Sequence, residues 1–244
     1  MLNLLIIDDN LYYSKNLINI IMENDSEYKI YKILTNGKEA FDTIINEKEK
    51  IDIILLDLNI PKCNGLEILE RIKQNNLKKY LSSIIVISGR LDMIAKLKNN
   101  PYLYTFINKT QGFEQILRTI HELSEFKKES NIENKIKEQL KLLKFSNKLI
   151  GTKYLYDAIL LILRNEDLYQ KSLKQDIYPI IAKKYNVSAH NIKCNINNAT
   201  VLMNCECEKN IVMNYFGFFD KKAEAKPKQV IEEIINKIKN DDLI

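Results

Sequence analysis

The stretch from Ile51 to Pro61, IDIILLDLNIP, constrains the fold of this chain more than any other. Its apolar run Ile53–Leu56 is of strand length, which is typical of a strand buried on both faces of a parallel sheet. Asp57 follows this run directly. Because open α/β sheets bind their ligands at the carboxyl ends of their strands, the position of Asp57 favours chemistry over packing.

Similar strand-length segments recur along the first half of the chain. They lie at residues 2–7, 28–33, 83–88 and 103–107. Apolar residues at helical spacing lie between or after them, at residues 17–21, 40–45, 66–72 and 113–120. Five strands alternating with helices predict an α/β doubly wound parallel sheet.

Polar residues follow four of these predicted strands. Asp8 and Asp9 follow the first, Asp57 the third, Ser88 ends the fourth, and Lys109 lies just past the fifth. Clustered carboxylates bind Mg²⁺, and Asp57 could then attack phosphorus to form an acyl phosphate. Ser88 and Lys109 would hold the phosphoryl oxygens. Each residue alone could be an ordinary strand-end polar group, but their recurrence at successive strand ends favours one shared site.

These motifs resemble the receiver domain of two-component response regulators over about residues 1–124. The resemblance rests on the pair Asp8-Asp9, the segment DLNIPKCNGLEIL that begins at Asp57, Ser88 and Lys109. It implies that Asp57 accepts a phosphoryl group from a histidine kinase or phosphotransferase. It also implies that Asp9, Asp57 and the Asn59 carbonyl ligate Mg²⁺, with Asp8 assisting through water.

The resemblance assigns a further role and shows one departure. Phe106 stands where the family keeps a switch aromatic that turns inward when Ser88 moves toward the phosphate. Thr110 follows Lys109 where the family usually has proline. The departure bears on the local loop geometry and leaves the charge of Lys109 unchanged.

Residues 125–145 form a charged segment between the two halves of the chain. Ile132, Ile136, Leu140 and Leu143 recur there at helical spacing, which would suit an amphipathic helix. The charged composition favours a flexible linker, and we place the domain boundary here.

Residues 146–244 are predicted to form an all-α domain. Apolar residues from Tyr154 to Ile162 trace one helix, and residues 177–185 a second, with Pro179 in its first turn. The turn Asn186-Val187 leads to Ser188, a suitable N-cap for a helix reaching about Met203. Helix, tight turn and helix are the outline of a helix-turn-helix.

Four segments of this half resemble the DNA-binding effector domain of the stage 0 sporulation protein A family. They are GTKYLYDAI, DIYPIIAKKYNVSA, YFGF and AKP, between Gly151 and Pro227. The resemblance implies a phosphorylation-dependent transcription factor that regulates sporulation initiation and acts as a dimer on DNA. It places the helix of residues 188–203 in the major groove.

This helix departs from the arginine-rich pattern of the family, because Lys193 is its one firm positive charge. Asparagine pairs with adenine, so an A·T-rich site would suit it. We expect base or phosphate contacts from His190, Asn191, Lys193, Cys194, Asn195, Asn197, Asn198, Lys183, Lys184 and Lys226. The alternative is a protein-interaction regulator with weakened or lost DNA binding, for example one that forms heterodimers with a true sporulation regulator.

Two other groups of residues in this half could form a site. His190, Cys194, Cys205 and Cys207 could offer four zinc ligands, but Cys-x-Cys is not the usual spacing and buried cysteines often act as small apolar side chains. Tyr215, Phe216, Phe218 and Phe219 could stack on bases, although an apolar cluster this near the last helix favours core.

Composition sets the remaining limits. A chain of 244 residues suits two domains, and neither a long apolar stretch nor an N-terminal leader is evident. We therefore expect a cytoplasmic protein without a membrane partner. Four unevenly spaced cysteines do not make a disulfide framework. The net charge of +5 permits a nucleic-acid partner. We expect no enzyme activity beyond self-catalysed phosphotransfer to Asp57 and slow dephosphorylation.

Overall fold

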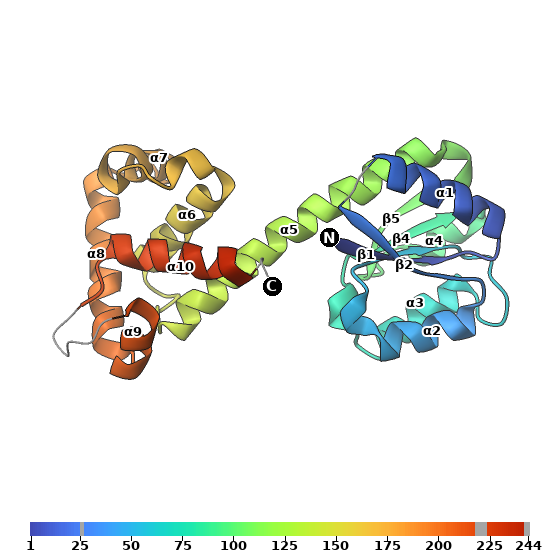
Figure 1. Cartoon of the computed structure of the whole chain (residues 1–244), viewed down its shortest axis with the longest axis horizontal. Coiled ribbons are helices and arrows are strands. Elements are labelled where there is room, and N and C mark those ends of the chain that lie inside the picture. Colours follow the sequence, from blue (N-terminus) through green and yellow to red (C-terminus); the bar gives the residue numbers. More distant parts are fainter. Residues whose placement is uncertain (25–26, 218–223, 242–244) are drawn as a thin grey trace. The chain divides into compact units, whose positions relative to one another are not determined.

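The computed structural model describes residues 1–24, 27–217 and 224–241 of the chain. The chain divides into two compact units, residues 1–127 and residues 128–244, which Figure 1 colours along the sequence. Among the described residues, none of the helices combines the length and apolar character needed to cross a lipid bilayer.

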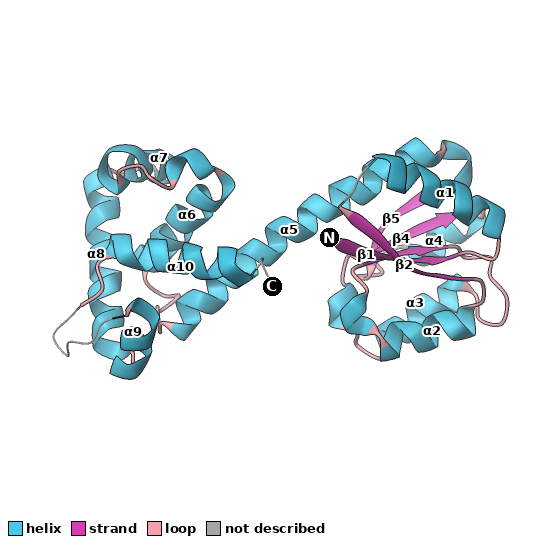
Figure 2. Cartoon of the chain, viewed as in Figure 1, coloured by secondary structure: helices cyan, strands magenta, loops and turns pink. Residues whose placement is uncertain are grey.

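The first unit is a parallel sheet with helical crossovers. Its elements, as far as the chain is described, are β1 (Leu2–Ile7), α1 (Leu11–Asn24), β2 (Tyr28–Leu34), α2 (Gly37–Asn46), β3 (Ile53–Leu56), α3 (Gly65–Gln74), β4 (Ile84–Ser88), α4 (Ile94–Leu97), β5 (Leu103–Asn108) and the beginning of α5 (Phe113–Leu142). The strand order is β2-β1-β3-β4-β5, and every pair is parallel. This confirms the predicted doubly wound fold, which Figure 2 shows as strands flanked by helices.

Alternating side chains of each strand build two cores. Leu5, Ile7, Ile54 and Leu56 pack on one face of the sheet with α2 and α3. Leu4, Ile6, Ile53 and Leu55 pack on the other face with α1 and the first turns of α5. The sheet is buried on both faces, as the apolar runs predicted.

The crossover helix α4 is much shorter than the other crossover helices of this unit. α4 covers only Ile94–Leu97, after a 3₁₀ turn at Leu91–Met93. The side chain of Leu97 is buried in the core beneath it, so this single turn still covers the sheet.

The prediction of a flexible linker at residues 125–145 is wrong. α5 continues as a helix to Leu142. Ile136, Leu140, Leu143 and Phe145 are buried in the core of the second unit. The apolar residues at helical spacing therefore outweigh the charged composition, because their burial stabilises the helix.

The second unit is helical throughout its described part. After the end of α5 it contains α6 (Ile150–Arg164), α7 (Tyr178–Tyr185), α8 (Ala189–Glu206), α9 (Lys209–Phe216) and α10 (Pro227–Asp241), with a π-helical turn at Leu173–Ile177 before α7. α7, the turn at residues 186–188 and α8 form the predicted helix-turn-helix.

Local capping explains the sharp turn between α7 and α8. Asn186 ends α7 in the left-handed conformation, with φ of 53°. Ser188 is the N-cap of α8, and its side-chain oxygen accepts a hydrogen bond from the Asn191 N–H at 3.1 Å. Both residue types favour these positions, so the turn is encoded locally.

The core of the second unit brings α6 against α8. A Cβ atom at Gly151 would lie 2.0 Å from the Asn195 carbonyl oxygen, so only glycine fits there. Tyr215 is buried and Phe216 packs against the same core, as the core interpretation predicts. The other two aromatic residues of that group, Phe218 and Phe219, lie outside the described residues.

Candidate functional site

Two central strands deliver carboxylates to the point where the strand order reverses. β1 and β3 are neighbours with crossovers leaving in opposite directions, which is where open α/β sheets bind ligands. Backbone bonds extend the ladder past each strand end. The Asp8 N–H donates to the Leu34 carbonyl at 3.0 Å, and the Asp57 N–H donates to the Ile7 carbonyl at 2.8 Å. The ladder thus fixes both backbones.

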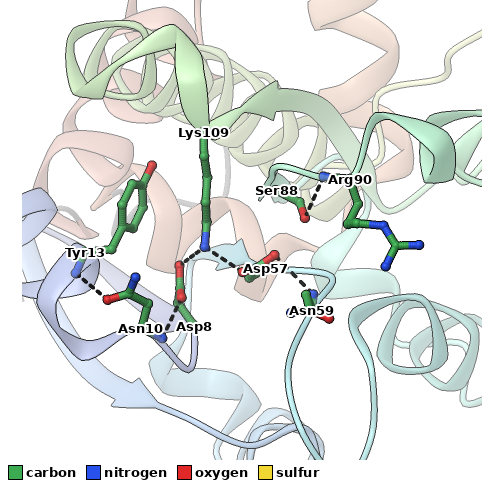
Figure 3. A network of polar contacts seen from close by, with 8 residues as sticks. All are labelled: Asp8, Asn10, Tyr13, Asp57, Asn59, Ser88, Arg90 and Lys109. Carbon is green, nitrogen blue, oxygen red and sulfur yellow. Dashed lines mark hydrogen bonds and ion pairs between the residues drawn. The ribbon is translucent and has the colours of Figure 1, made fainter.

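Lys109 joins the two carboxylates, as Figure 3 shows. Its Nζ lies 2.6 Å from Asp57 Oδ2 and 2.7 Å from Asp8 Oδ2. Asp8 and Asp57 are only 4% and 5% exposed. Asp9 is exposed, and one carboxylate oxygen from each of the three aspartates lies within 4.8 Å of the others.

Burial and pairing act in opposite directions on the charges of this site. Burial raises the pKa of Asp8, and the hydrogen bond from Lys109 only partly offsets that effect. For Lys109, burial lowers the pKa, but the hydrogen bonds that its ammonium group donates to Asp57 and Asp8, together with the negative charges of those carboxylates, outweigh burial, so the pKa is raised. Lys109 is therefore held as a cation.

The other predicted members lie in the loop after β3, on β4 and on β5. The Asn59 N–H donates to Asp57 Oδ1 at 3.1 Å. Ser88 is buried at the end of β4, and its hydroxyl accepts a hydrogen bond from the Arg90 N–H at 3.4 Å. Phe106 on β5 is half-buried against the core and pairs in register with Val86 on β4.

The loop that carries Lys109 is held by a capping box. The Thr110 N–H donates to Asn108 Oδ1 at 3.1 Å, and the Asn108 N–H donates to Gln111 Oε1 at 2.8 Å. A proline at position 110 would lack the first donor. Thr110 therefore replaces the family's proline with a hydrogen bond that fixes the 3₁₀ turn Lys109–Gln111.

Tyr13 is a neighbour of the site that the sequence interpretation missed. Lys109 Nζ lies 4.7 Å from the centroid of its ring, and this ring lies 4.9 Å from that of Phe113. Its side chain stands beside that of Lys109 in Figure 3. The available signal was an aromatic residue in the first turn of the helix that follows the acidic pair.

The donor set fits a hard divalent cation. Carboxylate oxygens from three aspartates converge within the reach of one ion, and Mg²⁺ prefers oxygen ligands. Two of these carboxylates are buried beside a single ammonium group, so their negative charge is only partly neutralised. Asp8, Asp9 and Asp57 would hold the ion, and the Asn59 backbone lies next to them.

α8 presents the residues proposed for nucleic-acid contact at different positions. His190, Asn191, Lys193, Cys194 and Asn198 are exposed, whereas Asn195 and Asn197 are half-buried. The amide of Asn195 donates to the Asn191 carbonyl and side-chain oxygens, both at 2.9 Å, so its donors are engaged within the helix.

Two lysines of α7 and the lysine just before α10 belong to the same unit as this helix. Lys183, Lys184 and Lys226 are exposed. Lys184 pairs with the buried Asp157 at 3.1 Å, which also accepts a hydrogen bond from Tyr185. The charge of Lys184 is thus partly neutralised by an ion pair within the domain.

The cysteines do not gather into a cluster with His190. Cys194 Sγ lies 3.3 Å from His190 Nε2, while Cys205 is exposed and Cys207 is buried. In the part of the chain that the structure describes, the one group of three or more potential metal ligands is Asp8, Asp9 and Asp57.

About half of the chain is similar to curated transcriptional activators and to solved response regulators. The DNA-binding transcriptional activator EvgA of Escherichia coli (strain K12) and that of Shigella flexneri are each 30% identical over 120 residues, which are 49% of this chain and 55% of each relative. A LuxR-family response regulator from Staphylococcus aureus aligns at 22% identity and a TM-score of 0.43, covering 50% of this chain and 98% of that one. A receiver domain from Clostridium thermocellum aligns at 22% and 0.44, covering 52% and 98%.

Family models account for both halves. The response regulator receiver domain matches residues 4–121, and the C-terminal domain of the sporulation initiation factor Spo0A matches residues 136–240. Both predicted resemblances are thereby confirmed. The chain belongs to the two-component response regulators, with a receiver domain followed by an effector domain of the Spo0A type.

Proposed function

We propose that this protein is a cytoplasmic, phosphorylation-dependent DNA-binding transcription factor that regulates sporulation initiation. The observation that carries the proposal is the buried carboxylate of Asp57, paired with Lys109 beside Asp8, in a chain whose second unit matches a DNA-binding effector family. Its partners would be a sensor histidine kinase or phosphotransferase and DNA, and phosphorylation would promote a homodimer.

The chemistry follows from the position of Asp57. An oxygen of its carboxylate attacks the phosphorus of a donor phosphohistidine, the P–N bond breaks, and its electron pair leaves with the imidazole nitrogen. An acyl phosphate forms on Asp57. Hydrolysis later breaks the acyl phosphate and releases inorganic phosphate, so the chain returns to its starting state without acting on any further substrate.

The neighbouring side chains supply the electrostatics. A bound Mg²⁺ would neutralise charge between the carboxylates and the incoming phosphoryl group. Lys109 already lies within ion-pair distance of Asp57 Oδ2 and would transfer its pairing to a phosphoryl oxygen. The Ser88 hydroxyl would donate to another oxygen, and its movement would leave space for Phe106 to turn inward.

Phosphorylation is tested by incubating the full chain with Mg²⁺ and a small acyl-phosphate donor. We expect intact-mass analysis to find one added phosphoryl group, and Asp57→Asn to abolish it. Since Asp52 lies outside the carboxylate cluster, Asp52→Asn is the matched control and should accept the group normally. An unchanged mass of the unsubstituted chain would contradict the proposal.

DNA binding is tested by selection from random duplexes, with and without the phosphodonor. Recovery of a shared sequence supports the proposal.

The alternative function, binding of a protein partner, is favoured by two apolar side chains on α8: Val201 and Leu202 are 55% and 41% exposed. If no duplex is retained even at low salt, the protein-interaction function replaces DNA binding.

A further inference from the structure

A groove beside α8 is lined by five lysines from three separate segments. It has a volume of about 520 Å³ and runs between the segment before α7, α8 and the start of α10. Its lysines are Lys171, Lys174, Lys193, Lys226 and Lys228, and none of the described side chains that line it is acidic. Polar groups of Ser172 and Asn197 share the lining. Such a surface attracts a polyanion.

Most of the positive charge of this groove is not paired with carboxylates. All five lysines are exposed. Lys228 lies 3.6 Å from Glu232, one turn further along α10. Among the described residues, no ion pair joins any of the other four to a carboxylate. Four ammonium groups around one groove repel one another, and an anion in the groove would relieve that repulsion.

The groove adjoins the surface proposed to read DNA. Lys193 and Asn197, one helical turn apart, line the groove from one edge of the exposed face of α8. His190, Cys194 and Asn198 occupy that face next to them. A duplex that placed base edges against this face would therefore bring one phosphodiester strand alongside the groove.

We propose that this lysine groove binds the phosphodiester backbone of the DNA strand that flanks α8. The proposal rests on the proposed function. The groove supplies sequence-independent affinity from outside the recognition helix, which compensates for a helix with one lysine and no arginine. Lys171, Lys174 and Lys228 thereby join the DNA interface.

The test compares salt dependence in the full-length chain. Lys171→Gln with Lys174→Gln removes two charges from the groove, and Lys148→Gln with Lys209→Gln removes two exposed charges of the same unit away from it. The affinity of each double variant is measured for the selected DNA site and for a duplex of unrelated sequence. The logarithm of the DNA association constant falls linearly with the logarithm of the salt concentration, by about 0.9 for each phosphate contact. We therefore expect the double variant of Lys171 and Lys174 to make this negative slope shallower by about 1.8. Both duplexes should be weakened by the same factor, roughly tenfold or more at physiological salt.

Each outcome decides between the two proposals. Equal slopes for the groove pair and the control pair, with the unsubstituted chain binding normally, overturn the groove and leave DNA binding intact. Loss of affinity on the selected site alone also overturns it, since a backbone contact carries no sequence preference. If the unsubstituted chain retains neither duplex at low salt, the DNA-binding function fails and the groove fails with it.

Discussion

The carbonyl oxygen of Asp57 occupies the space where residue 65 would carry a side chain: a Cβ atom at Gly65 would lie 2.5 Å from it. The Gly65 N–H also donates to the Leu58 carbonyl at 3.1 Å. The first residue of α3 is thus packed directly against the backbone of the proposed phosphoacceptor.

Gly65→Ala should therefore impair both stability and phosphorylation. The added methyl group must displace the backbone at Asp57, at a cost of about 1–3 kcal/mol. We expect a lower urea midpoint and slower acyl-phosphate formation by intact mass. Gly89→Ala is the matched control, because nothing lies within 4 Å of its added Cβ atom. Equal phosphorylation rates for the two variants would show that Asp57 tolerates the displacement.

Lys109→Ala should make the stability of the receiver unit depend more strongly on Mg²⁺ than that of the unsubstituted chain. Removing the ammonium group leaves Asp8 and Asp57 facing each other while nearly buried, which should cost about 3 kcal/mol without metal. Added Mg²⁺ should restore part of this loss. The measurement is urea unfolding with Mg²⁺ and with chelator.

The control for Lys109→Ala is Lys32→Ala, which removes an ion pair with Glu47 at 2.7 Å from a side chain that is 40% exposed. An exposed pair of this kind contributes at most about 1 kcal/mol, without dependence on Mg²⁺.

Lys109→Ala should still be phosphorylated, but phosphorylation should no longer change its DNA binding. A normal phosphorylation response in the gel shift would remove Lys109 from the coupling.

The receiver fold and the residues of its site were accessible from sequence for one physical reason. Apolar runs buried on both faces are strands, and parallel strands bring the residues after them to one edge. Asp8, Asp57 and Lys109 therefore lie together, as that argument expected. Tyr13 was not predicted as a neighbour of the site, because an aromatic residue in the first turn of a helix usually belongs to the core. Only the distance between its ring and Lys109 Nζ reveals the contact.

The effector half was predictable in outline and not in its surface. The turn at Asn186 and the cap at Ser188 are local signals and identify the helix pair. The prediction of a flexible linker was wrong because it gave the charged composition more weight than the apolar positions that recur as far as Leu143. The lysine groove could not be predicted, since Lys171, Lys193 and Lys228 come together only through the packing of separate segments.

Gly151→Ala should destabilise the effector unit strongly. Its added Cβ atom would lie 2.0 Å from the Asn195 carbonyl, so α6 and α8 must move apart. We expect a loss on the order of 3 kcal/mol in the free energy of unfolding, with weaker DNA binding because α8 shifts. Ile150→Ala, at the neighbouring exposed position, should change stability by less than about 0.5 kcal/mol. Similar urea midpoints for the two variants would contradict the close approach of α6 to α8 at Gly151.

Alkaline pH should destabilise the effector unit through Tyr178. Burial raises the pKa of Tyr178 to about 12, against about 10 for an unfolded chain. Below pH 10 the phenol is protonated in both states and stability does not depend on it. Between pH 10 and 12 the unfolded chain releases the proton while the folded chain keeps it, so stability falls by about 1.4 kcal/mol per pH unit.

Tyr178→Phe isolates this contribution, since phenylalanine keeps the buried ring and has no proton to release. We expect the slope of unfolding free energy against pH to be shallower by about one proton between pH 10 and 12, measured by urea unfolding under circular dichroism. Tyr12→Phe, at a side chain that is 77% exposed, should keep the slope of the unsubstituted chain. If both variants behave alike, the Tyr178 hydroxyl reaches water in the folded state, and the packing of α7 against the core is more open than its buried ring indicates.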